Sequence, residues 1–348
     1  MNNKPYLLTK EASRLLLPLT DLFATLQGKR VAIGLSGGVD SAMLAVCATE
    51  LASQYKITLS FIHVHHGLMP EADEWVEECL TLAKLLDVPC FIERVKVDTS
   101  SGLGIEGAAR EARYQAYYHF AKEQQVSHFL LAHHLNDQAE TVLLRLLRGS
   151  GVLGMRGMLS HIQKKEISFY RPWLGVDRAV ILKVAEGFTQ QYQWKPVQDS
   201  SNMDSRYKRG AIRQYLSPYL NQFWPSWKQN LSRHARLMQE MQQLADDMAK
   251  IDFDGLDIKD NQHSFCLKAW RMLPPYRQSN VLRYWLSLFQ LAMPSENRLK
   301  EWLKQLREVH QLGFDREVKL PHEGWVILIK KGRVIIVADQ YSSVTFQK

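Results

Sequence analysis

The segment Ser36–Ser41 combines two glycines with two hydroxyl groups and the carboxylate of Asp40, a set suited to binding phosphate. An apolar run, Arg30–Leu35, precedes it and predicts a buried strand, and helix-like sequence follows from Asp40. Because glycine carries no Cβ atom, the backbone can turn tightly here and approach a ligand. The start of the helix adds free N–H groups and the positive end of its dipole. We therefore predict a phosphate-binding turn, in which Asp40 orients the loop or contacts phosphate-bound Mg²⁺.

Two carboxylates follow a second predicted strand, within the segment Leu131–Thr141. Asp137 and Glu140 are three residues apart, so they share one face of a helix near its start. Acidic residues in a first turn also occur simply because they favour the helix dipole. Position strengthens a functional interpretation, since this strand should end beside the phosphate-binding turn. Two carboxylates there are suited to an ammonium group, a Mg²⁺ ion, or both.

Other polar groups are less specific. Arg110 and Arg113 share a helix face and either stay solvated, paired with neighbours such as Glu106, or neutralise charge on leaving pyrophosphate. The four glycines between Gly149 and Gly157 predict a tight loop at the mouth of the site. The histidines of His63–His66 alternate along a strand, and no cysteine or carboxylate completes a zinc site around them.

A basic and aromatic stretch, Ser205–Arg236, contains seven lysines and arginines and no acidic residue. Six aromatic side chains are interleaved with these cations: Tyr207, Tyr215, Tyr219, Phe223, Trp224 and Trp227. Cations contact phosphates and aromatic faces stack on unpaired bases, a combination typical of single-stranded RNA recognition. The aromatic residues would also be explained by packing at a domain junction.

Strand and helix patterns alternate over the first 200 residues. Predicted strands cover 30–35, 57–65, 89–97, 128–133 and 167–173. Predicted helices cover 40–54, 71–87, 105–125, 137–148 and 177–193. This alternation predicts an α/β fold, a doubly wound parallel sheet with helices on both faces and ligands at the carboxyl ends of the strands.

The pattern changes after Asp199. Helices are predicted near 226–250 and 276–311, with breaks at Pro274-Pro275 and Pro294-Ser295. Strands are predicted at 316–320, 325–330 and 333–338, the last two forming a hairpin. We therefore expect a catalytic domain over residues 1–215 and a basic, mainly helical α+β domain over residues 216–348.

Composition restricts the class of protein. A chain of 348 residues with 46% hydrophobic and 23% charged residues is typical of a globular protein of two or three domains. The four scattered cysteines form no C-x-x-C pair, and no apolar run is long enough to span a membrane. We expect a cytoplasmic protein with no membrane partner.

The charge is unevenly distributed along the chain. Residues 1–200 hold 21 basic and 21 acidic side chains, whereas residues 201–348 hold 23 basic and 15 acidic ones. This excess of positive charge favours a nucleic acid partner for the second part.

The motifs in their order along the chain carry a family resemblance. The first one resembles the SGGxDS pyrophosphate loop, or PP-loop, of the ATP-pyrophosphatase superfamily; it lacks the lysine of a Walker A loop. The whole series resembles the tRNA(Ile)-lysidine synthetase family. The matching segments are Ser36–Ser41, His63–Leu68, Glu111–Tyr114, Leu131–Thr141, Arg148–Gly154, Arg171–Leu174, Asp199–Asn202 and Arg209–Arg213.

This resemblance implies a Rossmann-like PP-loop ligase that modifies the wobble cytidine of a CAU-anticodon tRNA(Ile). ATP would adenylate the cytosine with release of pyrophosphate, and free L-lysine would then displace AMP to give lysidine. The implied ATP-binding residues are Ser36, Gly37, Gly38, Val39, Asp40 and Ser41. The implied catalytic residues are Asp40, Arg110, Arg113, His133, Asp137 and Glu140, the last two handling lysine or Mg²⁺. The implied tRNA-binding residues are Arg206, Lys208, Arg209 and Arg213.

The sequence departs from the family pattern in two respects. Gly210 stands where family members often have asparagine. A further C-terminal tRNA-binding domain, which many members carry, is expected to be missing from this chain. The sequence leaves a homodimer and the metal ligands open. Alternatives are a tRNA thiolase of the same superfamily, which the scattered cysteines disfavour, and a non-catalytic RNA-binding protein, which the intact motifs disfavour.

Overall fold

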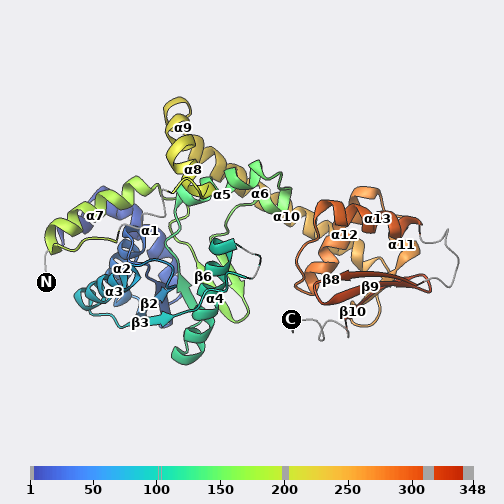
Figure 1. Cartoon of the computed structure of the whole chain (residues 1–348), viewed down its shortest axis with the longest axis horizontal. Helices are drawn as coiled ribbons and strands as arrows, with labels where there is room; N and C mark the ends of the chain where they lie inside the picture. Colours follow the sequence, from blue (N-terminus) through green and yellow to red (C-terminus); the bar gives the residue numbers. More distant parts are fainter. Residues whose placement is uncertain (1–3, 101, 103, 198–203, 309–316, 340–348) are drawn as a thin grey trace. The chain divides into compact units, whose positions relative to one another are not determined.

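The structure is a computed structural model that describes residues 4–100, 102, 104–197, 204–308 and 317–339 (Figure 1). Contacts divide the chain into two compact units, Met1–Met238 and Gln239–Lys348. The boundary expected after residue 215 falls inside the first unit. The segment Asp199–Asn202 of the family pattern and Arg316, predicted to open a strand, lie outside the described residues. Within those residues, no helix is both long enough and apolar enough to cross a membrane.

The first unit is built on a six-stranded sheet in the order β3-β2-β1-β4-β6-β5. Its strands are β1 Arg30–Gly34, β2 Thr58–His65, β3 Cys90–Arg94, β4 His128–Leu130, β5 His161–Lys164 and β6 Ile167–Tyr170. All neighbours pair in parallel except β5, which joins β6 as an antiparallel edge. The chain order reverses at β1, which lies between β2 and β4. The predicted doubly wound α/β fold is confirmed, and its switch point lies at the carboxyl ends of these three strands.

The five helices predicted within residues 40–193 match observed helices to within a few residues, and six further elements were not predicted. The elements are η1 Pro5–Leu7, α1 Lys10–Thr25, α2 Val39–Ala52, α3 Ala72–Leu86, α4 Gly104–Gln124, α5 Leu135–Leu147, α6 Val152–Met155, α7 Arg178–Tyr192, α8 Lys208–Ala211, a π-helix Ile212–Leu216, and α9 Ser217–Phe223. The long helix α10, Trp227–Asp254, contains the boundary between the two units. The unpredicted elements are η1, α1, α6, α8, the π-helix and α9; the longest of these is α1, which continues through Pro18.

The two faces of the sheet have separate cores. Val31 and Ile33 of β1 pack with α1, α2, α3 and α7, whereas Ala32 packs with α4. This division follows from the strand itself, because successive side chains point to opposite faces. Figure 1 shows α4 on the side of the sheet opposite α1 and α2. Because helices cover both faces of the sheet, side chains on both sides of each strand are buried, and the strand sequences are therefore continuous apolar runs.

The second unit combines helices with an antiparallel sheet in the order β7-β10-β9-β8. Its elements after α10 are β7 Ser264–Cys266, α11 Leu267–Arg271, α12 Pro275–Leu288, α13 Glu296–Glu308, β8 Val318–His322, β9 Trp325–Lys330 and β10 Arg333–Ala338. Its core contains Trp270, Trp285 and Trp302. The β9–β10 hairpin is confirmed, with Lys331 and Gly332 both at positive φ, as a type I′ turn requires. The mainly helical α+β prediction is therefore confirmed, although β7 was not predicted.

Candidate active site

The phosphate-binding turn joins β1 to α2, and its two hydroxyl groups fix its shape. Ser41 Oγ accepts a hydrogen bond from the Ser36 backbone N–H at 3.1 Å and donates to the Gly38 carbonyl at 3.0 Å. Gly37 has φ +83°, and a Cβ there would lie 2.8 Å from Val197 Cγ2, so only glycine fits. Gly38 is the N-cap of α2 and has no side chain to cap it. The first N–H groups of α2 are therefore suited to an anion.

Asp40 lies in the first turn of α2 and contacts two cationic or polar groups from distant elements. Arg178, at the start of α7, donates through Nε to both carboxylate oxygens at 3.1 and 3.2 Å. His134 Nε2 lies 3.7 Å from Asp40 Oδ2. Burial would raise the pKa of Asp40, but His134 and Arg178 outweigh it and lower that pKa overall. Asp40 is therefore held ionised beside the phosphate-binding turn, and Arg178 is a site residue that the sequence did not reveal.

His134 links the N-terminus of α5 to the site. Its Nδ1 accepts a hydrogen bond from the Asp137 backbone N–H at 3.4 Å, while the Asp137 carboxylate accepts from the His134 backbone N–H at 3.1 Å. This reciprocal pair is a capping box. Since Nδ1 accepts, the ring hydrogen is on Nε2, which lies 3.4 Å from Asp137 Oδ2. One imidazole thus brings the carboxylates of Asp40 and Asp137 together.

The two carboxylates of α5 bind an arginine that was predicted to bind tRNA. Arg213, in the π-helix, donates to both oxygens of Glu140 at 2.8 Å and to Asp137 Oδ1 at 3.3 Å. The Glu140 side chain is only 6% exposed. Burial would lower the pKa of Arg213, but Glu140, Asp137 and Asp40 raise it overall. The neighbouring Arg209 donates to Thr141 Oγ1 at 3.1 Å, so both arginines reach inward to α5.

His133, three residues after the end of β4, is a neutral side chain. Burial lowers its pKa to about 3, and the charges of Arg171, Arg110 and Arg209 act in the same direction against Asp137. Its Nδ1 is buried and has no hydrogen-bond partner in the part of the chain described. His66, after β2, has the same property, with burial and Arg113 lowering its pKa to about 4. These imidazoles are suited to accept hydrogen bonds from a bound ligand.

A group of arginines adjoins His133. Arg110 lies over the ring of Tyr114 at 5.2 Å and donates to its hydroxyl at 3.3 Å. Burial lowers the pKa of Arg145, and neighbouring guanidinium groups lower it further. Those neighbours are Arg156, Arg110, Arg209 and Arg148. So many cations within electrostatic reach of one another are suited to a polyanion.

Helix α5 also holds the glycine-rich loop that follows it. Gln138 donates to the Met158 carbonyl at 2.9 Å and accepts from the Met158 N–H at 2.7 Å. Arg145 Nη1 donates to the carbonyls of Gly154 and Gly157 at 2.7 and 2.8 Å. The predicted loop is therefore fixed to the helix that carries Asp137 and Glu140.

Counter-charges for the basic stretch come from outside it. Arg206 pairs with Asp204, and Lys228 donates to Asp177 at 2.6 Å. The stretch itself contains no acidic residue, but the fold supplies acids from neighbouring segments to at least two of its cations. The exposed aromatic residues are Tyr207, Tyr215, Tyr219, Phe223 and Trp224, whereas Trp227 is buried. Most of the aromatic side chains thus remain accessible to a base.

Comparisons with known proteins show which family the chain belongs to. A PP-loop domain model matches residues 11–220, and a TilS substrate binding domain model matches residues 265–335. The tRNA(Ile)-lysidine synthase of Bordetella parapertussis is 47% identical over 307 residues, which cover 88% of this chain and 89% of that protein. The chain belongs to the tRNA(Ile)-lysidine synthase family. The member from Haemophilus influenzae strain 86-028NP is 37% identical over 289 residues, which cover 81% of this chain and 64% of that protein.

A solved structure outside the family shares the fold. It is the U34-tRNA thiolase NcsA from Methanococcus maripaludis with its [4Fe-4S] cluster, with a TM-score of 0.54 and 16% identity over 66% of this chain and 80% of that one. In the present family member, burial raises the pKa of Cys47 and of Cys90 to about 12, and also raises that of Cys79. Thiols of this kind are unreactive. The family assignment replaces the thiolase and the non-catalytic alternatives.

The departure from the family pattern at Gly210 has a steric reason. A Cβ on Gly210 would lie 2.0 Å from the backbone oxygen of Asp204. Glycine lets the turn that ends at Tyr207 pack directly on α8, where the Tyr207 N–H donates to the Asp204 carbonyl at 3.0 Å. In this family member, the backbone of Asp204 therefore occupies the space that a side chain at position 210 would need.

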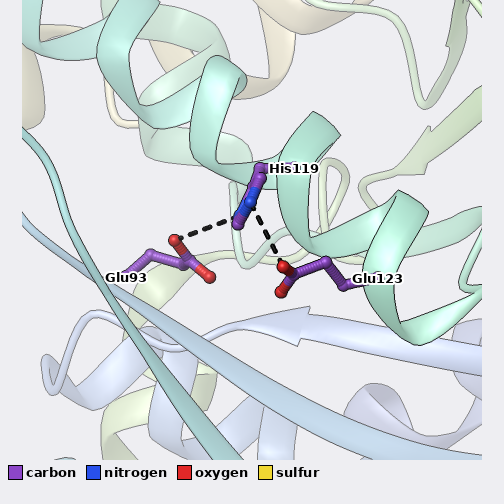
Figure 2. A group of neighbouring side chains, drawn as sticks. All are labelled: Glu93, His119 and Glu123. Carbon is purple, nitrogen blue, oxygen red and sulfur yellow. Dashed lines mark ion pairs between the residues drawn. The ribbon is translucent and has the colours of Figure 1, made fainter.

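A cluster that could hold a metal lies away from these residues. Figure 2 shows His119 of α4 between Glu93 of β3 and Glu123 of α4. Glu93 lies 3.6 Å from Nδ1 and Glu123 lies 3.3 Å from Nε2 of the same ring. Because the two ring nitrogens point in different directions, the carboxylates share an imidazole rather than one coordination site. Asp40 and Asp137, whose carboxylates lie 3.7 and 3.4 Å from His134 Nε2, belong to a different part of the family member and are not in this cluster.

Proposed function

We propose that this protein forms lysidine in a tRNA(Ile) with a CAU anticodon, using ATP and free L-lysine. The cytosine O2 attacks the α-phosphorus of ATP, the bond between the α- and β-phosphates breaks, and pyrophosphate leaves. The ε-amine of lysine then attacks C2, the C2–O2 bond breaks, and AMP leaves with that oxygen. The relatives' name supports the lysidine product, and the PP-loop match supports ATP as the substrate.

The phosphate-binding turn would hold the pyrophosphate part of ATP against the N-terminus of α2. Its hydroxyl groups already fix the loop, so the N–H groups need no rearrangement to receive the anion. Asp40 would contact a phosphate-bound Mg²⁺, which would neutralise phosphate charge when bound. We propose that Arg110 and Arg113 stabilise the charge that develops as pyrophosphate leaves.

The amine attack requires an unprotonated lysine side chain. Asp137 and Glu140 would bind the incoming ammonium group and accept a proton as it becomes nucleophilic. His133 is neutral and its Nδ1 is unpartnered among the residues described, so it would accept a hydrogen bond from the activated nucleotide. The pairing of Asp137 and Glu140 with one cation is the observation that carries the proposal, because it shows that this pair can bind a cation.

We propose that residues 1–215 perform catalysis and that residues 216–348, with Arg206 and Lys208 just before them, contact the tRNA. Both of these cations are exposed, and the accessible aromatic residues lie on the following helices. Arg209 and Arg213 would act at the wobble nucleotide rather than along the tRNA backbone, since both contact α5.

The test is turnover of α-labelled ATP with an isoleucine tRNA of CAU anticodon, with and without lysine. AMP release that requires both tRNA and lysine supports the ligase. AMP release that requires tRNA but does not depend on lysine would contradict the choice of nucleophile and leave the adenylating activity. Methionine tRNA with the same anticodon is the matched control and should release no AMP.

A further inference from the structure

Arg213 occupies the carboxylates to which the proposed function assigns the substrate amine. Its guanidinium takes both oxygens of Glu140 at 2.8 Å, and its Nη2 also contacts Asp137 at 3.3 Å. With the Glu140 side chain only 6% exposed, a second cation has no open approach to it. An ammonium group must therefore take the place of the guanidinium at Glu140, or bind to Asp137 alone.

The exchange of one cation for another is electrostatically reasonable. Moving Arg213 out without a replacement would leave a buried carboxylate uncompensated, which is strongly unfavourable. An arriving lysine ammonium restores the charge balance at the same oxygens. Arg213 is thus expected to leave only when it gains another anionic partner and when lysine is present.

The segment that carries Arg213 is suited to respond to RNA. Arg213 faces α5 from a single π-helical turn, Ile212–Leu216, and Tyr215 on that turn is 55% exposed. Lys208 is exposed one turn earlier. π-helical turns are rare, usually consist of a single turn inside a longer helix, and are frequently found at functional sites. A nucleic acid that contacts the outer side of this turn would act on the element that holds the guanidinium inside.

We infer that Arg213 keeps the lysine site closed until tRNA binds, when its guanidinium moves from Glu140 to the RNA and admits the substrate amine. This inference rests on the proposed function and adds an order of binding to it. Arg213 is a positioning residue in this account: it decides when lysine binds and takes no part in the bond changes. The closed form prevents the enzyme from being occupied by free lysine before its tRNA arrives.

The test measures lysine affinity by equilibrium dialysis with labelled lysine and the full chain, without ATP. Dialysis is done with and without unmodified isoleucine tRNA of CAU anticodon. The wild-type protein should bind lysine more tightly with tRNA. Arg213→Gln should bind lysine equally with and without tRNA, and without tRNA its Kd should be about tenfold lower than wild type, as expected if the open form is populated to about 10%. Gln214→Ala, on the same exposed turn, is the matched control and should keep the wild-type difference.

Three outcomes would overturn the inference. Weaker lysine binding by Arg213→Gln would mean that the guanidinium helps to hold lysine. If lysine binding by Arg213→Gln still depends on tRNA as in the wild type, and Glu140→Gln no longer binds lysine, then Arg213 does not control access to the lysine site. The proposed function would stand in that case. Equal lysine binding by wild type and Glu140→Gln would contradict both.

A second variant covers the case in which Arg213→Gln does not fold. Arg213→Lys keeps the charge but replaces the two-pronged contact with a single ammonium, so it should lower the tRNA-free Kd for lysine to a smaller extent. An unchanged or higher Kd for lysine in this variant would contradict the inference that Arg213 keeps the lysine site closed.

Discussion

Replacing Glu140 with glutamine should weaken lysine binding far more than it slows turnover. The side chain keeps its shape but loses the charge that makes its hydrogen bonds strong, and those bonds measure 2.8 Å to a guanidinium in the present structure. Hydrogen bonds to charged groups contribute about 1.5–3 kcal/mol. Since 1.4 kcal/mol corresponds to a factor of ten, the KM for lysine should rise about 10- to 150-fold.

The same change should lower the free energy of unfolding by a moderate amount. Glu140 is buried, so its loss of charge leaves Arg213 with Asp137 as a remaining anionic partner at 3.3 Å. We expect a loss of about 1–3 kcal/mol, within the range for a buried polar group that loses a partner. The protein should therefore still fold, and the kinetic effect can be measured.

The assay is AMP formation at saturating ATP and tRNA over a range of lysine concentrations. Glu106→Gln is the matched control: that carboxylate is 70% exposed and lies 3.9 Å from Arg209, so the KM for lysine should stay within about twofold of wild type. If Glu140→Gln lowers the melting temperature but leaves the KM for lysine unchanged, Glu140 only holds Arg213, and the amine binds elsewhere.

Three further predictions concern the rest of the site. Asp40→Asn should abolish tRNA-dependent AMP formation while leaving tRNA affinity intact in a filter-binding assay. Normal turnover by this variant would mean that Asp40 has no role in binding the phosphates of ATP. Replacing Arg206 or Lys208 with glutamine should reduce the slope of log affinity for tRNA against log salt by about 0.7–0.9 each, whereas Arg209→Gln should leave it unchanged. Because burial lowers the pKa of His133 to about 3 in the folded protein, below its usual 6.5, the unfolded chain takes up this proton first and stability should fall as pH drops from 6.5 toward 3. His133→Asn should reduce that slope by about 1.4 kcal/mol per pH unit in urea unfolding; equal slopes would mean that His133 is not held neutral.

The sheet and its helices could be predicted because each leaves a local pattern. Buried parallel strands give apolar runs, and the helices between them give apolar residues at helical spacing. The helix Lys10–Thr25 has that spacing too, but Pro18 inside it obscures the pattern. The strand His161–Lys164 is mostly exposed at the edge of the sheet, so it lacks the apolar signal of its neighbours.

The carboxylates of the site could be found from the sequence, but their partners could not. Asp137 and Glu140 share a helix face, which spacing alone reveals, whereas Arg178 is 138 residues from Asp40 and Arg213 is 73 from Glu140. Pairs so far apart are set by how the sheet and helices pack, and no local pattern reports them. A signal for His134 was present: a residue before a helix, three positions ahead of Asp137, fits a capping box.

Helix α5, Leu135–Leu147, has partners on several of its faces, and this restricts how the gene can change. Asp137 and Glu140 bind Arg213, Gln138 and Arg145 hold the glycine-rich loop, and Ala139 and Val142 are buried. A deletion of one codon would rotate every later side chain by about 100°, since an α-helix has 3.6 residues per turn. The two carboxylates, the loop and the core would then lose their partners together. Length variation among functional relatives should therefore avoid these thirteen positions and collect in the connections on either side.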